Sequence, residues 1–126
     1  MRSPSLEFGK AAEAAAVEFL KSKGYKILEL NYKNQFGEID VIARDKGVIC
    51  FVEVKARHSL RQGAPQEAVT PAKQRQISRA AVSYLKSKGL LDRPARFDVL
   101  GILYEHNQQK VSLIADAFEL ASGLTD

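Results

Sequence analysis

The sequence predicts a single α/β domain in which a mixed β-sheet is flanked by helices. Segments typical of helices and strands follow one another in the order helix, three strands, helix, two strands. The 126 residues fit one compact domain, residues 1–126, and no linker or low-complexity segment divides them. A sheet covered by helices lets elements in this order bury their apolar faces.

Two segments are predicted to be helices because of their composition and their end signals. The alanine-rich run from Leu6 to Lys23 is followed by Gly24, a residue typical of helix C-caps. The second helix begins with Thr70 as N-cap and Pro71 in the first helical position. Its apolar residues recur at helical spacing up to the phrase LKSKG, which also closes the first helix.

Five segments are predicted to be strands, because apolar and β-branched residues dominate them and turn residues separate them. They are residues 25–32, 38–45, 48–57, 96–105 and 111–118. The stretch HSLRQGAPQEAV, which follows the third strand, is the longest segment without a regular pattern. Long loops in compact domains are often functional, so we expect this loop to lie near a site.

The overall charge favours an anionic partner such as nucleic acid. The chain carries 19 basic and 15 acidic residues, a net charge of +4 and an isoelectric point near 9.3. No apolar run approaches the ~20 residues that span a bilayer. The N-terminus lacks the pattern of a secretion signal, and the single Cys50 cannot form an internal disulfide. We therefore expect a soluble protein of the reducing cytoplasm that does not bind membranes.

The predicted hairpin of residues 38–57 carries charges within an otherwise apolar pattern. Alternate residues from Val48 to Ala56 are small or apolar and share one face of their strand, whereas Glu53 and Lys55 lie on the other face. In the preceding strand the apolar face is made by Ile39, Val41 and Ala43. The tightest hairpin in which the two apolar faces coincide uses Lys46 and Gly47 as a two-residue turn and pairs Asp45 with Val48.

In this register Asp40 falls opposite Glu53, and Glu38 falls opposite Lys55. Paired Cβ atoms lie ~4.5–5.5 Å apart, so two carboxylates there repel by about 3 kcal/mol at an effective dielectric constant of 20. A shared proton, a nearby cation or a bound divalent metal can offset the repulsion. The alternative is a solvated face on which Lys55 neutralises the acids.

The first helix supplies another acidic candidate. On a helical wheel Glu13 lies inside the apolar arc. A carboxylate that points toward the core is costly unless it is paired or binds a metal. The alternative is a glutamate at the edge of the arc that reaches solvent or an arginine.

Taken together, GEID, FVEVKAR, RFDVLGI and the helix GKAAEAAAVEFL resemble the YraN-like family of small uncharacterised bacterial proteins. Through that family the chain is similar to the PD-(D/E)xK nuclease superfamily, close to archaeal Holliday junction resolvases and RecB-type nuclease domains. The resemblance runs over residues 8–118 and implies a restriction-endonuclease-like core. The order of helix glutamate, hairpin aspartate and ExK carries it, although Ile39 stands where the superfamily's label has proline.

The resemblance assigns roles to individual residues. The superfamily's aspartate, second acid and lysine fall on Asp40, Glu53 and Lys55, with Glu38 in support. The residues that it implies as ligands of Mg²⁺ or Mn²⁺ are Glu13, Asp40, Glu53 and the backbone carbonyl of Val54. Polar and basic residues that would contact nucleic acid are Arg57, Arg61, Lys73, Arg75, Gln76 and Arg79.

Three functions are compatible with these residues. The first is a metal-dependent endonuclease that hydrolyses DNA, including branched or structured DNA, with Lys55 orienting the attacking water or stabilising the phosphorane. The alternative is a nucleic-acid-binding or partner-docking module that keeps the nuclease fold with little or no catalytic activity. A purely structural interaction protein leaves the acidic residues unexplained. Analogy with the resolvases also suggests a homodimer.

Overall fold

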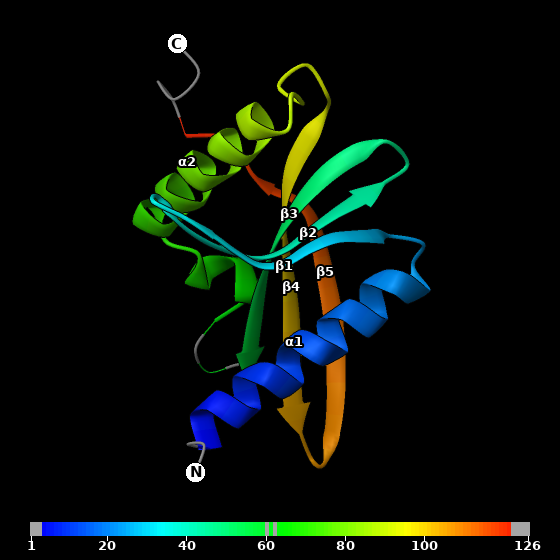
Figure 1. Ribbon diagram of the computed structural model, residues 1–126. Coiled ribbons are helices and arrows are strands. Elements are labelled where there is room, and N and C mark those ends of the chain that lie inside the picture. The colour runs from blue at the N-terminus through cyan, green and yellow to red at the C-terminus, as the bar shows by residue number, and fades with distance from the viewer. Residues whose placement is uncertain (1–3, 60, 62, 122–126) are drawn as a thin grey trace.

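The computed structural model describes residues 4–59, 61 and 63–121, and its elements follow the predicted order (Figure 1). A short 3₁₀ helix, η2, lies in the segment that was predicted to be a loop. Neither α-helix is long and apolar enough, in its described part, to cross a membrane. The elements are α1 (Pro4–Ser22), β1 (Lys26–Asn34), β2 (Gly37–Asp45), β3 (Val48–Arg57), η2 (Pro65–Ala68), α2 (Pro71–Ser87), β4 (Ala95–Glu105) and β5 (Gln108–Phe118).

The five strands form one mixed sheet in the order β1-β2-β3-β4-β5. All neighbours are antiparallel except β3 and β4, which are parallel. A parallel pair needs a crossover connection, and the chain supplies it with η2 and α2. This arrangement confirms the predicted single α/β domain with a mixed sheet.

Each helix covers one face of the sheet, and the alternation of β2 and β3 decides which side chains it covers. Val41, Cys50 and Val52 are fully buried in the cluster beneath α1. Ile42 and Phe51, one residue away on the same strands, are buried in the cluster beneath α2. Burying a side chain such as Phe51 contributes roughly 1.5–3 kcal/mol, so the two faces fix the register of the central strands. Figure 1 shows the two helices lying apart with the strands between them.

Helix α2 begins as the sequence predicts. The side chain of Thr70 accepts a hydrogen bond from the backbone N–H of Lys73 at 3.2 Å, and Pro71 occupies the first turn. Both features stabilise the helix start, since the first backbone N–H groups of a helix have no partner within it. The cap places Lys73 in the first turn of α2.

The hairpin register is confirmed over five pairs, from Asp45–Val48 to Val41–Val52. The turn residues Lys46 and Gly47 both have positive φ, 49° and 84°, as expected of a two-residue hairpin turn.

The prediction for Ile39 is wrong: it lies in the cluster beneath α2 instead of sharing a face with Val41. Its partner on β1, Tyr32, packs against the same cluster, whereas Leu30, the partner of Val41, lines a cavity beside α1. Between the two pairs lies Asn31, with a φ of 50°. A left-handed residue breaks the regular alternation of a strand, and both strands change face at this point.

Candidate active site

The candidate site lies where β2 separates from β3. The ladder between the two strands ends at the pair Val41–Val52, so the predicted cross-strand pair of Asp40 with Glu53 is not formed. Asp40 is the next residue of β2 beyond this end. Its carboxylate accepts a hydrogen bond from the backbone N–H of Val54 at 2.8 Å, so a side chain replaces the missing backbone acceptor. In a strand the N–H and C=O of one residue point toward the same neighbour, so the carbonyl of Val54 lies on the same edge as Asp40.

Glu53 is a buried acid beside this edge, with only 6% of its surface exposed. Its Oε1 lies 3.6 Å from Nζ of Lys55 and 3.9 Å from Nζ of Lys73. Lys55 comes from the same face of β3, and Lys73 comes from the capped first turn of α2. Two strands and one helix therefore bring two acids and two lysines together.

The lysines do not neutralise the acids completely. The pKa of Glu53 is raised to about 7, first by burial and then by the neighbouring charge of Asp40, although both lysines act to lower it. Burial also raises the pKa of Asp40, although the hydrogen bond from the backbone N–H of Val54 lowers it. An acid whose pKa is raised is destabilised in its ionised form. Both acids therefore favour the approach of another positive charge.

Glu13 lies on the α1 side of Asp40, as the sequence predicts. The two residues line a cavity of about 270 Å³ together with Leu30 and Asn31. Burial raises the pKa of Glu13; the hydrogen bond with Asn31 lowers it, and the charge of Asp40 raises it. Among the described residues, however, no three His, Cys, Asp or Glu side chains lie close enough to hold one metal ion. The structure thus brings Glu13 near Asp40 without joining it to Glu53 in one three-acid group.

The expected pairing of Glu38 with Lys55 is not formed. Glu38 pairs with Lys33 of β1, with 3.9 Å between Oε2 and Nζ, and Lys55 approaches Glu53 instead. The reason is the separation of β2 from β3, which removes the register on which the expectation rested. Glu38 keeps an electrostatic role, because its charge contributes to the raised pKa of Asp40.

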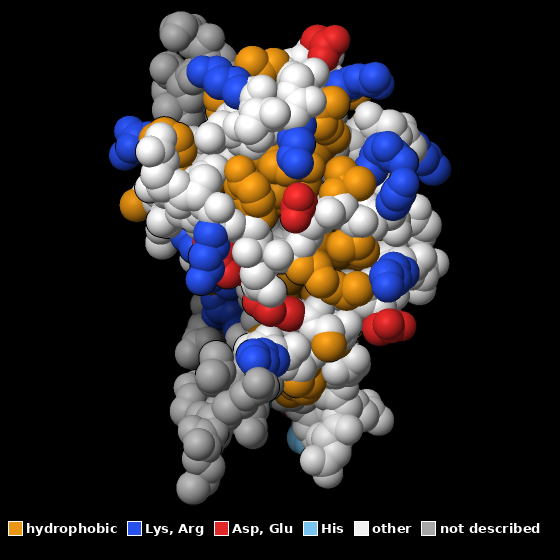
Figure 2. Space-filling view, in the orientation of Figure 1, with side chains coloured by type: hydrophobic (Ala, Val, Ile, Leu, Met, Phe, Trp, Pro, Cys, Tyr) orange, Lys and Arg blue, Asp and Glu red, His pale blue; other side chains and the backbone are white. Residues whose placement is uncertain are grey.

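The predicted nucleic-acid-binding residues are not gathered at one point. Lys73 contacts the acids, and the side chain of Gln76 lies against Gly37 at the start of β2. Arg57 ends β3 and is half-buried, whereas the other three arginines are exposed; these are Arg61 in the loop and Arg75 and Arg79 on α2. Figure 2 shows lysine and arginine side chains spread over the visible face, with acidic groups between them.

A second buried acid, Asp98, was not predicted. It is fully buried and accepts hydrogen bonds from Nε of Arg96, at 3.1 and 3.2 Å, and from the backbone N–H of Asp116 at 2.8 Å. The other end of Arg96 donates to Tyr25 and Asp45. The sequence held a signal for it, because an arginine and an aspartate two residues apart in a strand share one face. We call these four side chains the arginine cluster: Tyr25, Asp45, Arg96 and Asp98.

The donor set at the candidate site fits a hard divalent cation. Asp40 and Glu53 offer carboxylate oxygens, and Val54 offers a backbone carbonyl on the same edge of β3. Mg²⁺ prefers oxygen ligands and is commonly held by only one or two carboxylates, with water and phosphate completing its shell. Burial raises the pKa of both acids, so a bound cation would stabilise their ionised forms.

Comparison with known proteins identifies similar sequences over nearly the whole chain. The model of the uncharacterised protein family UPF0102 matches residues 12–102, which include both acids and both lysines of the site. A UPF0102 protein of Geotalea uraniireducens is 50% identical over 121 residues, which cover 95% of each chain. One of Syntrophus aciditrophicus is 49% identical over 119 residues, or 94% of each chain. One of Geobacter sulfurreducens is 45% identical over 114 residues, or 90% of this chain and 89% of that one.

Proposed function

This chain belongs to the uncharacterised protein family UPF0102, and we propose that it is a metal-dependent endonuclease that hydrolyses DNA, including branched or structured DNA. The observation that carries the proposal is the pair of insufficiently neutralised acids, Asp40 and Glu53, beside Lys55. Strongly perturbed carboxylates beside a specific charged partner are typical of functional sites. The resemblance of the helix glutamate, hairpin aspartate and ExK motif to the PD-(D/E)xK nucleases supports the same chemistry.

Asp40, Glu53 and the carbonyl of Val54 would hold Mg²⁺ or Mn²⁺, with Glu13 as a further ligand. When bound, the ion would make a water molecule nucleophilic and stabilise the charge that develops on the phosphate. The proposed ligands are contributed by β2, β3 and α1, so folding of the sheet assembles them.

We assign the role of catalytic cation to Lys55 in this proposal. Its side chain is 28% exposed, so its ammonium group lies beside Glu53 and still reaches solvent. There it would orient the attacking water or stabilise the phosphorane. Lys73, 3.9 Å from the same carboxylate, would contact a neighbouring phosphate. The arginines and Gln76 would position the duplex through its backbone, without reading its sequence.

The direct test is incubation of the purified protein with plasmid, branched and single-stranded DNA in the presence of Mg²⁺ or Mn²⁺. We expect cleavage by the wild type and loss of cleavage in Glu53→Ala. Lys55→Met should also lose cleavage but should keep most of the metal-dependent rise in melting temperature, because lysine acts here as a catalytic group and not as a ligand. Cleavage that persists in both variants would come from another site or a contaminant.

Binding should rest mostly on phosphate contacts. Affinity should therefore fall steeply with salt concentration and depend little on DNA sequence. Charge reversal at Lys73 and Arg75 should weaken binding to all sequences alike, as measured by fluorescence anisotropy. Affinity that is indifferent to salt would contradict this mode of binding.

A second candidate is a nucleic-acid-binding or partner-docking module with the same fold and little or no turnover. It is favoured by one observation: within the part of the chain that the structure describes, three acidic side chains do not converge on one point. Metal-dependent stabilisation together with cleavage would favour the nuclease. Salt-sensitive binding without cleavage in either metal would favour the module. The homodimer suggested by analogy can be tested by sedimentation of the free protein.

A further inference from the structure

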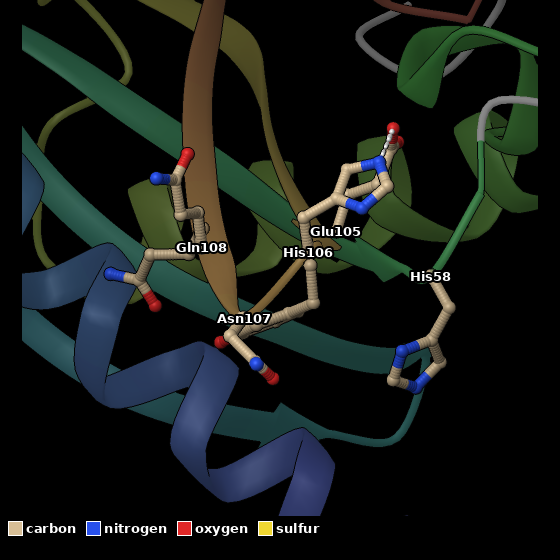
Figure 3. Close-up of a pocket in the computed structure, with 7 residues that line it drawn as sticks. His58, Glu105, His106, Asn107 and Gln108 are labelled. Carbon is tan, nitrogen blue, oxygen red and sulfur yellow. Dashed lines mark ion pairs between the residues drawn. The ribbon is translucent and has the colours of Figure 1, made fainter.

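A pocket of about 510 Å³ opens between the end of β3 and the turn that joins β4 to β5 (Figure 3). It is lined by His58, by Tyr104 and by the turn residues 105–109. We call it the turn pocket. In Figure 3 the His58 ring faces the turn across the opening, with His106 and Asn107 on the opposite side.

One wall of the turn pocket is a stack of aromatic rings. The ring of Phe8 lies on that of His58, with 4.4 Å between centroids and 21° between planes. Tyr104 meets Phe8 edge-on at 5.0 Å and lies 6.3 Å from His58. His58 itself is exposed and lines the pocket. Its imidazole is thus supported on one face by Phe8 while the residue remains exposed at the pocket.

The opposite wall carries amide side chains on a tight turn. His106 and Asn107 have φ values of 52° and 59°, and the flanking Glu105 and Gln108 form a strand pair. Two consecutive left-handed residues make a tight hairpin turn, which restricts the positions of the side chains beside it. In Figure 3 the amide of Asn107 points toward His58, whereas that of Gln108 points to the other side of the turn. The amide of Asn107 offers two N–H donors and a carbonyl acceptor.

An aromatic face together with amide donors and acceptors matches the chemistry of a nucleobase. Proteins bind unpaired bases by stacking them on aromatic side chains, histidine included, and by hydrogen-bonding their edges. A base within a duplex is less accessible, because the neighbouring bases cover its two faces and its pairing partner covers one edge.

The turn pocket is close to the candidate active site along the chain. His58 directly follows β3 and stands three residues beyond Lys55, a distance of roughly 10 Å along an extended chain. Beyond Val52 the edge of β3 is no longer paired with β2. Lys55 lies on the α2 face of the sheet, beside Glu53, whereas His58 lies on the α1 face, stacked on Phe8. A strand with phosphates near Lys55 and a base near His58 would have to pass around the end of β3.

We propose that the turn pocket binds one unpaired nucleobase of the nucleic-acid substrate, stacked on the imidazole of His58 and hydrogen-bonded by the amide of Asn107. The inference rests on the proposed function. It narrows the substrate to nucleic acids that have unpaired bases beside the point of cleavage, such as flaps, open junctions or single strands.

The test measures binding without metal, so that cleavage cannot interfere. One probe is a labelled single strand of about 12 nucleotides. The second is the same strand with abasic sugars at its centre, which keeps the phosphates and removes the bases. The third is a fully paired duplex. Wild type should bind the base-bearing strand about tenfold more tightly than the abasic strand, because one stacked base contributes that much.

His58→Ala should lose this preference and should leave the affinity for the abasic strand and the duplex unchanged. His58→Phe is the matched control, because a phenyl ring still stacks but cannot accept or donate a proton; it should keep the preference. A free nucleoside monophosphate at the strand's concentration should not compete. If the monophosphate competed, the pocket would bind a free nucleotide, and the proposal that it binds a base within a strand would be wrong.

The remaining outcomes separate this inference from the proposed function. Wild type that binds the base-bearing and abasic strands equally would overturn the subsite and leave the nuclease proposal standing. Wild type that binds none of the three probes would overturn both. Equal loss of affinity for all three in a folded His58→Ala protein would show a structural role for the ring stack instead. If that variant does not fold, the comparison of the two strands on wild type remains decisive.

Discussion

The sheet holds buried carboxylates in two places, which differ in how closely a positive side chain approaches them. In the arginine cluster, Asp98 binds the guanidinium of Arg96 through both oxygens and also accepts a backbone N–H. In the candidate site, the lysine nitrogens stay 3.6 and 3.9 Å from Glu53, beyond good hydrogen-bonding distance. Asp98 is directly hydrogen-bonded to its counter-charge, and Glu53 is not.

The electrostatic consequences follow this geometry. Although burial lowers it, the pKa of Arg96 is raised by its hydrogen bonds with Asp98 and Asp45. Burial raises the pKa of both Glu53 and Asp40, and the available lysines do not reverse it. The same fold can therefore neutralise a buried acid with its own residues. Where it does not, the acids are available to a cation from solution.

The largest effect is expected from breaking the arginine cluster. Asp98→Ala removes the main partner of Arg96 and leaves the N–H of Asp116 without its acceptor. Removing one partner of a buried ion pair costs about 3–5 kcal/mol. The free energy of unfolding from urea titration should fall by this amount. A loss below about 1 kcal/mol would show that the cluster is not a stabilising element.

The next effect is a dependence of stability on pH that arises from Glu53. Its pKa rises from 4.5 to about 7 on folding, so between these values the folded state binds more protons than the unfolded state. Stability should therefore fall as the pH rises through this window, by at most about 3 kcal/mol. Glu53→Gln should flatten the fall in urea titrations between these pH values.

The matched control for this pH dependence is Glu38→Gln, which removes a more exposed glutamate from the neighbouring strand. It should leave the pH profile almost unchanged. Identical profiles for wild type and Glu53→Gln would contradict the assignment of the effect to Glu53.

A smaller effect is expected from metal ions. Mg²⁺ or Mn²⁺ at about ten times its dissociation constant stabilises the folded state by roughly 1.4 kcal/mol, so the melting temperature should rise by several degrees. Without metal, Asp40→Asn and Glu53→Gln should be at least as stable as wild type, because each removes one of two repelling charges. Both should gain less from the ion. A wild-type melting curve that neither ion shifts at millimolar concentration would favour the binding module.

The smallest effect is expected from an exposed ion pair. Lys33 and Glu38 lie 3.9 Å apart, with side chains 73% and 41% exposed. Solvent screens such pairs, so Lys33→Ala should change the free energy of unfolding by less than about 0.5 kcal/mol. A larger loss of unfolding free energy would show that an ion pair stabilises this sheet even when it is exposed, so that burial is not what makes the arginine cluster stabilising.

Local patterns predicted most of the fold and part of the site. Alternation placed Cys50 and Val52 in the core, and cap residues located the start of α2. The change of face at Asn31 could not be read, because asparagine tolerates left-handed backbone but does not require it. The expectation for Ile39 failed for that reason, and the expectation for Glu38 failed because β2 separates from β3 beyond Val41.

Contacts between distant segments account for the rest. The arginine cluster joins residues 25, 45, 96 and 98, and only the last two are close in the sequence. The ring stack of the turn pocket joins Phe8, His58 and Tyr104 from three separate elements. Sequence spacing carries no signal for such sets, because they exist only once the sheet has formed.

Cys50, buried between β3 and α1, can report how often the structure opens. It is the one cysteine of the chain, it is fully buried, and burial raises the pKa of its thiol to about 12. Thiol reagents attack the thiolate, so labelling has to wait until β3 is released from its neighbours. Where reclosing is faster than labelling, the labelling rate reports how often the sheet opens. The labelling rate of Cys50 can thus measure how each substitution near the two acidic regions changes the opening of the sheet, without an added probe.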